Sequence, residues 1–292
     1  MFGGNQLAVF PDASRIPPDV MPRIAREFNY SETTFVLPPT NPSHAARVRI
    51  FTPGKELQFA GHPTVGTAHV LASIGAIKLT GDETHVVLEE GVGPVPVTIR
   101  SSKGTPVFAA LSVAKLPETG PPAPSIQGLA AALSLEPSDF VGGDMSPEGV
   151  SCGTPFLFVP LRTRAAVAKA RVNGDAWERH VSPYWAPEIF FFAMEGERPG
   201  SDVRARMFAP GLGVPEDPAT GSAAVGMGGY LAARSAQRDG TLKWTVEQGF
   251  EMGRPSILEV EVDKRGGKVT GVRVGGASVL VCEGDMRITD NR

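Results

Sequence analysis

The sequence predicts an α+β protein built from two similar halves, each a curved antiparallel sheet around one central helix. The main observation is an internal repeat, in which RIFTP and AGHPTVGTA at 49–68 return as RMFAP and EDPATGSA at 206–223. EEG at 89–91 then returns as EQG at 247–249, in the same order. A motif series that recurs in order at a nearly constant offset indicates two copies of one supersecondary unit.

The first half is predicted to begin with a helix and to continue as strands. Residues 17–28 open with prolines, place apolar side chains at helical spacing and end at Asn29, which predicts a helix. Gly and Pro residues then separate several strand-like runs at hairpin intervals. These runs are TTFVL, RVRIF, THVVLE, VPVTIR and PVFAALSV.

The second half follows the most proline-rich stretch of the chain, LPETGPPAPS at 116–125, which we interpret as a linker. We therefore predict two domains, 1–117 and 118–292. Helices are expected near 125–134 and 163–171, and a third is expected from DPATGSA to about Arg234. The predicted strands are PFLFVPL, IFFFAM, VRARMFA, LKWTVEQ, SILEVEVD, KVTGVRV and SVLVCEG.

The two predicted central helices, PTVGTAHVLASIGAI and PATGSAAVGMGGYLAA, lack a charged face. Such a pattern indicates a helix that is buried on all sides. Each glycine costs about 1 kcal/mol of helix propensity. The glycines near both N-termini therefore indicate close approach of the backbone to another backbone or to a ligand.

Composition excludes several classes of function. The chain has 292 residues, of which 41% are hydrophobic and 20% charged, with a net charge of −3. We find no basic run with interleaved aromatic residues, so nucleic acid is not an expected partner. No stretch approaches the roughly 20 apolar residues of a membrane span, and no charged leader precedes the first apolar residues. These observations predict a globular protein of the cytoplasm.

The two cysteines, Cys152 and Cys282, are too few for a disulfide framework and lack metal-ligand spacing. We expect reduced thiols. SCGTP around Cys152 is followed by a strand-like run, which does not place the thiol at a helix N-terminus where its pKa would fall. His69 is interpreted as a core residue. Because no metal-ligand pattern and no glycine-rich nucleotide motif is present, we expect neither a metal nor a cofactor.

His62 and Asp217 stand at matching places in the two copies of the repeat. Pro63 and Pro218 look like first-turn prolines, which places His62 and Asp217 at or just before two helix N-termini. Free backbone N–H groups and the helix dipole favour an anion there. If the two N-termini face each other, the cleft between the halves would bind a small anionic metabolite.

Each candidate has a structural alternative. Asp217 before a proline could be an ordinary N-cap, and a lone histidine such as His62 is more often structural than catalytic. Glu32 in YSETTFVL could be solvated or could cap a strand, but burial would raise its pKa and suit it to acid–base catalysis. Ser222 could bind substrate or form a hydrogen bond within its helix.

Five segments carry a resemblance that extends along nearly the whole chain: GNQLAVF at 4–10, IAREFNYSETTFV at 24–36, RIFTPGKELQFAGHPTVGTA at 49–68, RARMFAPGLGVPEDPATGSA at 204–223 and EQGFEMGRPS at 247–256. On these residues the chain resembles the PhzF-like phenazine-biosynthesis family, within the diaminopimelate epimerase and proline racemase group. The resemblance implies a diaminopimelate epimerase-like fold, an active site in the cleft between the domains, and a homodimer.

The resemblance also implies a cofactor-independent isomerase that transfers a proton on a small carboxylate-bearing substrate. It assigns the main acid–base role to Glu32 and places His62 and Asp217 against the substrate. Ser31, Gly61, Thr220, Gly221 and Ser222 are the expected binding residues. The alternatives are a non-catalytic metabolite-binding protein with the same cleft and a cysteine racemase, which the placement of the two cysteines disfavours.

Two features depart from the family pattern. Gln6 stands where the family usually has proline, and the family's first strand has no counterpart before Asn5. Either the start is shortened or the first sheet lacks one edge strand.

Overall fold

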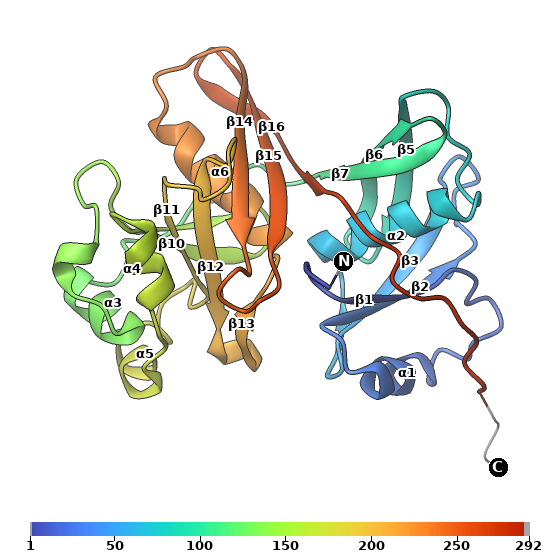
Figure 1. Cartoon of the computed structure of the whole chain (residues 1–292), viewed down its shortest axis with the longest axis horizontal. Coiled ribbons are helices and arrows are strands. Elements are labelled where there is room, and N and C mark those ends of the chain that lie inside the picture. The colour runs from blue at the N-terminus through green and yellow to red at the C-terminus, as the bar shows by residue number, and fades with distance from the viewer. Residues whose placement is uncertain (1, 289–292) are drawn as a thin grey trace.

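The structure is a computed structural model that describes residues 2–288. Figure 1 shows two halves side by side, each with strands around one long helix. The helices of the first half are α1 (Met21–Phe28) and α2 (Gly61–Ser73). Its strands are β1 (Leu7–Phe10), β2 (Glu32–Leu37), β3 (Ala46–Phe51), β4 (Glu56–Leu57), β5 (Glu83–Glu90), β6 (Gly93–Ser102) and β7 (Thr105–Ser112).

The second half has more helices. They are α3 (Ile126–Leu133), α4 (Arg164–Lys169), α5 (Gly174–His180) and α6 (Gly221–Arg234), with 3-10 turns η1 (Pro137–Asp139) and η2 (Pro210–Leu212). Its strands are β8 (Glu118–Thr119), β9 (Glu148–Ser151), β10 (Pro155–Pro160), β11 (Ile189–Ala193), β12 (Val203–Ala209), β13 (Val214–Asp217), β14 (Gly240–Gln248), β15 (Ser256–Arg265) and β16 (Lys268–Gly276). The sequence did not predict α5.

Strand pairing confirms the repeat. The series β1, β2, β3, β5 pairs as parallel, antiparallel, parallel, and the series β10, β11, β12, β14 pairs in the same way. The arginines of the repeated motifs also form the same ion pair. Arg49 Nε lies 2.7 Å from Glu56 Oε1, and Arg206 Nε lies 2.7 Å from Glu216 Oε1.

The parallel pairs correct the prediction of purely antiparallel sheets. Parallel neighbours need a crossover connection, and a helix supplies each one. The crossover between β1 and β2 contains α1, and the one between β3 and β5 contains α2. In the second half α4 and α5 connect β10 to β11, and α6 connects β12 to β14. The sheet is therefore mixed.

One ladder joins the two halves into a continuous sheet. β7 pairs antiparallel with β16, with Leu111 opposite Val274. In the predicted linker, β8 pairs with β9 of the second half. The apolar core likewise extends across both halves, from Val48 and Leu88 to Phe158 and Val260.

The central helices are closely wrapped, as predicted. A Cβ added at Gly226 of α6 would lie 2.6 Å from the Phe158 ring, and one at Gly228 would lie 2.7 Å from Val260. Real Cβ atoms essentially never come so close to a neighbour. The glycines of α6 are therefore needed for its contact with the sheet.

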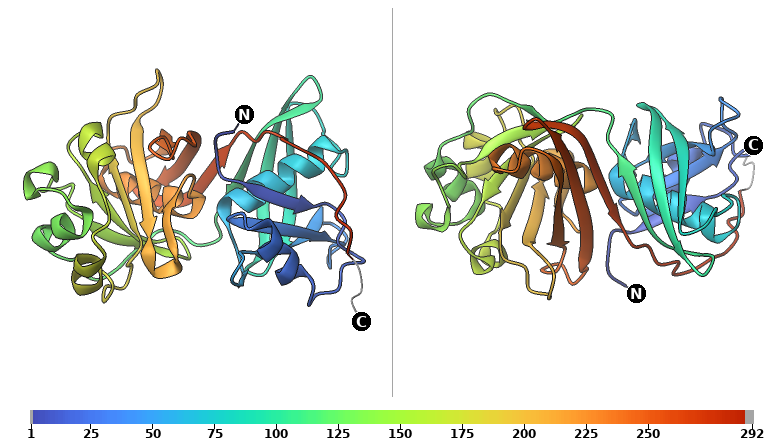
Figure 2. Two further views of the ribbon diagram at one scale, coloured as in Figure 1. Left: turned by 60° about the horizontal axis from the view of Figure 1, so that its bottom comes forward. Right: turned by 90° about the horizontal axis from the view of Figure 1, so that it is seen from above.

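The predicted strand SVLVCEG is wrong. Residues 277–288 follow β16 without forming a strand and run from the second half onto the first, as the red segment in Figure 2 shows. Val279, Leu280 and Val281 are between 50% and 59% exposed. This segment has strand-like composition but forms no ladder with another strand of the described chain, and a strand exists only when its backbone groups are paired.

Candidate active site

The N-termini of the two central helices meet where the halves join. A Cβ added at Gly61 would lie 3.1 Å from the Cα of Gly221 and 3.3 Å from the backbone nitrogen of Ser222. The two backbones are therefore in direct contact, which confirms that the N-termini face each other. Because first-turn N–H groups lack partners inside their own helix, two sets of donors and two positive helix ends converge here.

A cavity of about 1000 Å³ opens beside this junction. Asn5, Gly61, His62 and Gly221 lie in its wall. The cavity therefore reaches His62 and the first residues of both central helices, whereas Glu32, Asp217 and Ser222 do not line it.

Glu32 and His62 face each other across the first half's part of the site. Glu32 is the first residue of β2 and His62 the second residue of α2. Glu32 Oε2 lies 3.2 Å from His62 Nε2, and the two side chains are only 15% and 19% exposed. Neither atom has a hydrogen-bond partner, so the pair is close but not aligned as a hydrogen bond.

Burial determines the charge of this pair. Burial, and after it the nearby Asp217, raises the pKa of Glu32 to about 8. Burial lowers the pKa of His62 to about 4. Near neutral pH, Glu32 therefore holds a proton while the imidazole is uncharged.

The backbone of Gln6 acts on the His62 ring in the direction opposite to burial. It raises the pKa of His62, but burial outweighs this effect. Nε2 of His62 has no hydrogen-bond partner and lies beside the carboxyl group of Glu32.

Asp217 is held by a network from three parts of the chain. Asn5 Nδ2 donates to Oδ1 at 2.8 Å, and Thr220 Oγ1 donates to Oδ2 at 2.5 Å. Gln248 Nε2 donates to the Asp217 carbonyl at 2.7 Å. Burial raises the pKa of Asp217 to about 6, and the bonds from Thr220 and Asn5 act in the opposite direction.

The structure corrects the placement of Asp217. α6 begins at Gly221 with Thr220 as its N-cap residue, so Asp217 and Pro218 precede the helix. Asp217 instead ends β13 and pairs with Met207 of β12. It is therefore neither at the helix N-terminus nor an N-cap. In contrast, Pro63 does lie in the first turn of α2, as predicted.

The match between His62 and Asp217 is also wrong. Asp217 lies opposite Met207, whereas in the first half Leu57 lies opposite Ile50. Ile50 and Met207 each follow the repeated arginine, so Asp217 corresponds to Leu57. His62 and Ser222 are the second residues of α2 and α6, and they are the matching pair.

The remaining predicted residues are Ser222, Thr220 and Ser31. Ser222 is half-buried in the first turn of α6, and Thr220 is buried with its hydroxyl group bound to Asp217. Ser31 is exposed just before β2. The predicted binding set omitted Asn5 and Gln248. Their signals were the GNQLAVF segment and the change from EEG to EQG between the repeats.

The second half has its own buried glutamate. Thr33 lies opposite Phe51 and Ile189 lies opposite Phe208, so Glu188 matches Glu32 in the repeat. Glu188 is 6% exposed, and burial raises its pKa. Its Oε1 would lie 3.6 Å from a Cβ added at Gly211 in the second half.

His69 and the two cysteines were expected to have no catalytic role. His69 is 8% exposed and lies in the buried part of α2. Burial raises the pKa of the Cys152 thiol to about 12, and Cys282 is exposed. Within residues 2–288, no group of three or more metal-ligating side chains could hold a metal ion. No helix in that range is long and apolar enough to span a membrane.

Comparison with known families decides the classification. Residues 1–284 match the family described as phenazine biosynthesis-like protein, PhzC-PhzF. The chain belongs to this family.

Relatives that match nearly the whole chain carry isomerase names. An uncharacterized isomerase of Mesorhizobium japonicum is 39% identical over 98% of this chain and 94% of its own. The trans-2,3-dihydro-3-hydroxyanthranilate isomerase of Pseudomonas fluorescens is 35% identical over 97% of this chain and 94% of its own. The protein is therefore a PhzF-family isomerase.

Solved structures agree with the fold. A phenazine biosynthesis protein of the PhzF family from Bacillus anthracis superposes with a TM-score of 0.86 at 26% identity, over 98% of this chain and 94% of that one. A hydroxyproline epimerase from Agrobacterium vitis shares the fold, with a TM-score of 0.55 at 15% identity over 91% of this chain and 78% of that one. The predicted diaminopimelate epimerase-like fold is confirmed.

Proposed function

We propose that this PhzF-family isomerase transfers a proton between two carbon atoms of a small carboxylate-bearing substrate, without a cofactor, and that Glu32 carries the proton. The observation that supports this is the placement of Glu32. Its side chain is 15% exposed, and its carboxyl group holds a proton near neutral pH and lies 3.2 Å from an uncharged imidazole.

An isomerisation of this kind needs one group to take a proton at one position and return it at another. A group whose pKa lies near the working pH serves both steps. With a pKa of about 8, Glu32 is mostly protonated near neutral pH, and its ionised minor form would take the proton that the protonated form then returns at the second position. The lone pair of His62 Nε2 would hold the Glu32 proton in a hydrogen bond between the two steps and would orient the carboxyl group.

The substrate carboxylate would bind at the helix junction. Backbone N–H groups in the first turns of α2 and α6, at Gly61, Gly221 and Ser222, would donate to it. The absence of side chains at the two glycines lets both backbones approach the same anion. Asp217 would contact a polar group of the substrate from the second half.

The names of relatives support this class of substrate. The Pseudomonas enzymes are named for trans-2,3-dihydro-3-hydroxyanthranilate, which carries a carboxylate. The alternative of a binding protein without turnover has less support, because relatives over the full length of the chain are named isomerases.

Hydrogen exchange tests the role of Glu32. In deuterated water, wild type should incorporate deuterium into trans-2,3-dihydro-3-hydroxyanthranilate or a related carboxylate. Glu32→Gln should lower the rate by about 10²-fold or more while the substrate still binds. Glu188→Gln is the matched control, since it removes the corresponding buried carboxyl group of the other half, and it should exchange normally. Undiminished exchange in Glu32→Gln would overturn the assignment.

A further inference from the structure

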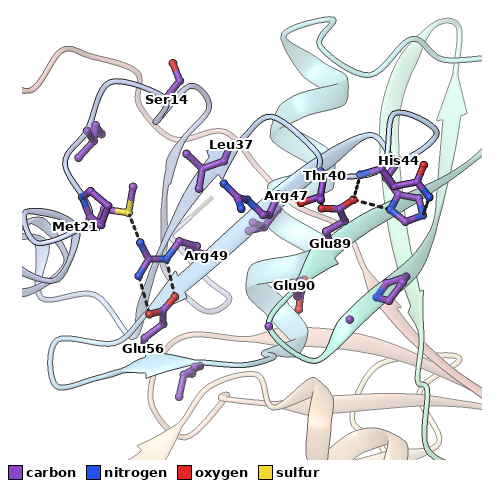
Figure 3. A pocket seen from close by; sticks show the side chains of 18 residues that line it. Ser14, Met21, Leu37, Thr40, His44, Arg47, Arg49, Glu56, Glu89 and Glu90 are labelled. Atoms are coloured by element: carbon purple, nitrogen blue, oxygen red, sulfur yellow. Dashed lines mark hydrogen bonds and ion pairs between the residues drawn. The ribbon is translucent and has the colours of Figure 1, made fainter.

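A second cavity, of about 810 Å³, lies in the first half and is lined by residues of α1 and β3, among them Met21 and Arg49 (Figure 3). Glu90, the last residue of β5, forms part of its wall. This side chain is only 7% exposed, and its Oε2 has no hydrogen-bond partner. Its Oε1 lies 2.5 Å from Thr64 Oγ1 in α2.

Thr64 links Glu90 to the active site. It lies two residues after His62 in the first turn of α2, and its hydroxyl oxygen is also 2.7 Å from the carbonyl oxygen of Ala60. Ala60 is the N-cap residue that directly precedes Gly61. Thr64 therefore joins Glu90 to the carbonyl group at which α2 begins.

The hydrogen count determines the direction of these bonds. A threonine hydroxyl group has one hydrogen and accepts through its lone pairs, whereas a carbonyl oxygen can only accept. Thr64 can donate to Ala60 and still bind Glu90 only if Glu90 is the donor. Both bonds are satisfied together when the carboxyl group of Glu90 keeps its proton.

In the second half, the counterpart of Glu90 also binds a threonine hydroxyl group, and there the donor is unambiguous. Gln248, the last residue of β14, donates from Nε2 to Thr220 Oγ1 at 2.9 Å. Thr220 in turn donates to Asp217 Oδ2. A primary amide nitrogen can only donate. Thr220 directly precedes α6, whereas Thr64 is the fourth residue of α2, so the two threonines are not counterparts, but each is bound by the last residue of the matching strand.

Neighbouring residues confirm that Glu90 and Gln248 are counterparts. The preceding residue in each half, Glu89 or Glu247, accepts two successive backbone N–H groups from a loop. The donors Thr40 and Asn41 precede Glu197 and Arg198 by 157 residues, and Glu89 precedes Glu247 by 158, so acceptors and loops match at nearly one offset. A protonated glutamate in one half therefore takes the place of a glutamine in the other.

We propose that Glu90, in its protonated form, is a positioning residue of the active site, which fixes the first turn of α2, and with it Gly61 and His62, through Thr64. This inference rests on the proposed function of that site. Glu90 does not touch the junction itself and acts only through Thr64.

The surroundings of Glu90 favour the protonated form. Burial raises the pKa of Glu90 to about 8. The charged groups that line the same cavity are largely paired with one another. Arg49 binds Glu56, and Glu89 binds His44 and two backbone amides, while Arg47 is exposed (Figure 3).

Loss of this proton should loosen the site. Above a pH of about 8, ionised Glu90 can only accept, so the Thr64 hydrogen turns toward it and away from Ala60. The first turn of α2 then loses one of its two side-chain bonds. We expect a lower rate of proton transfer at alkaline pH with little change in KM.

The test compares Glu90→Gln, which copies the amide of the second half, with Glu90→Ala. At pH 7, Glu90→Gln should keep kcat within about twofold of wild type, and Glu90→Ala should lose about tenfold in kcat at similar KM. An alanine-like defect in Glu90→Gln would overturn the proposal. The reciprocal variant Gln248→Glu places a carboxyl group beside Asp217 and should be impaired.

Thermal unfolding without substrate tests the proton itself. The folded-state pKa of Glu90 lies above its unfolded value, so its stabilising effect is complete below about 4.5 and is lost as pH rises through about 8. The unfolding midpoint of Glu90→Gln should therefore rise relative to wild type between pH 5 and pH 9, by a few degrees. A constant difference would overturn the proposal. This readout needs no turnover, so it stands apart from failure of the Glu32 assignment.

Discussion

Gly61 and Gly221 touch backbone to backbone, although they begin helices in opposite halves of the molecule. A Cβ on Gly61 would lie 3.1 Å from the Cα of Gly221, and one on Gly221 would lie 3.3 Å from the Cα of Gly61. Backbone atoms cannot swing aside as a flexible side chain can. The contact therefore fixes the spacing of the two N-termini and the position of the proposed carboxylate site.

Gly61→Ala should separate the two helices. We expect the free energy of unfolding to fall by about 1–3 kcal/mol. We also expect substrate affinity to fall, because the N–H groups of the two helices no longer converge on one carboxylate. Urea denaturation and binding of a carboxylate substrate measure the two effects. Gly54→Ala is the control, because its Cβ would meet nothing nearer than 3.9 Å. Normal stability and binding in Gly61→Ala would contradict the role of this contact.

Asn5 should set the proton affinity of Asp217. Asn5→Ala removes the hydrogen bond at 2.8 Å, so the pKa of Asp217 should rise further and kcat should fall about 5- to 100-fold. Asn5→Asp places a second carboxyl group beside Asp217 and should be more impaired than Asn5→Ala. The kcat and KM of both variants test this order. Equal activity in the two variants would show that the charge of Asp217 is not controlled from Asn5.

Stability should fall as pH rises because of the buried carboxyl group of Glu32. Its folded-state pKa of about 8 lies above its unfolded value near 4.5, so its stabilising effect is present below 4.5 and lost as pH rises through 8. The loss is on the order of a few kcal/mol. Chemical denaturation from pH 5 to 9 should show a flatter profile for Glu32→Gln than for wild type. Parallel profiles would place the Glu32 proton affinity near that of an exposed glutamate.

The sequence predicted the duplication because its motifs include residues that make the same contact twice. Arg49 and Arg206 each form a bidentate ion pair with a glutamate across a short hairpin, so the repeated arginine marks the same local structure in both halves. The contact between the helix N-termini followed from glycines that lack any local reason to be in a helix. Such features are visible without coordinates.

The prediction that His62 matches Asp217 was wrong because it aligned Pro63 with Pro218. In the second half, pairing with β12 and the Gln248 bonds hold residues 217–220 in a non-helical path, so α6 begins later in the motif than α2 does. That difference depends on a strand partner far away in sequence. Burial of Glu32 and Glu90 is likewise set by tertiary packing, so neither shifted pKa could be derived from local residues.

The ladder between β7 and β16 has a consequence for any attempt to divide the protein. Cutting the chain after residue 117 would strip both strands of their neighbour and leave two open sheet edges, each with apolar residues such as Leu111 and Val274 on it. The same cut would remove the hydrogen bond from Asn5 to Asp217. The duplicated units have thus become mutually dependent, and neither should remain monodisperse when produced alone.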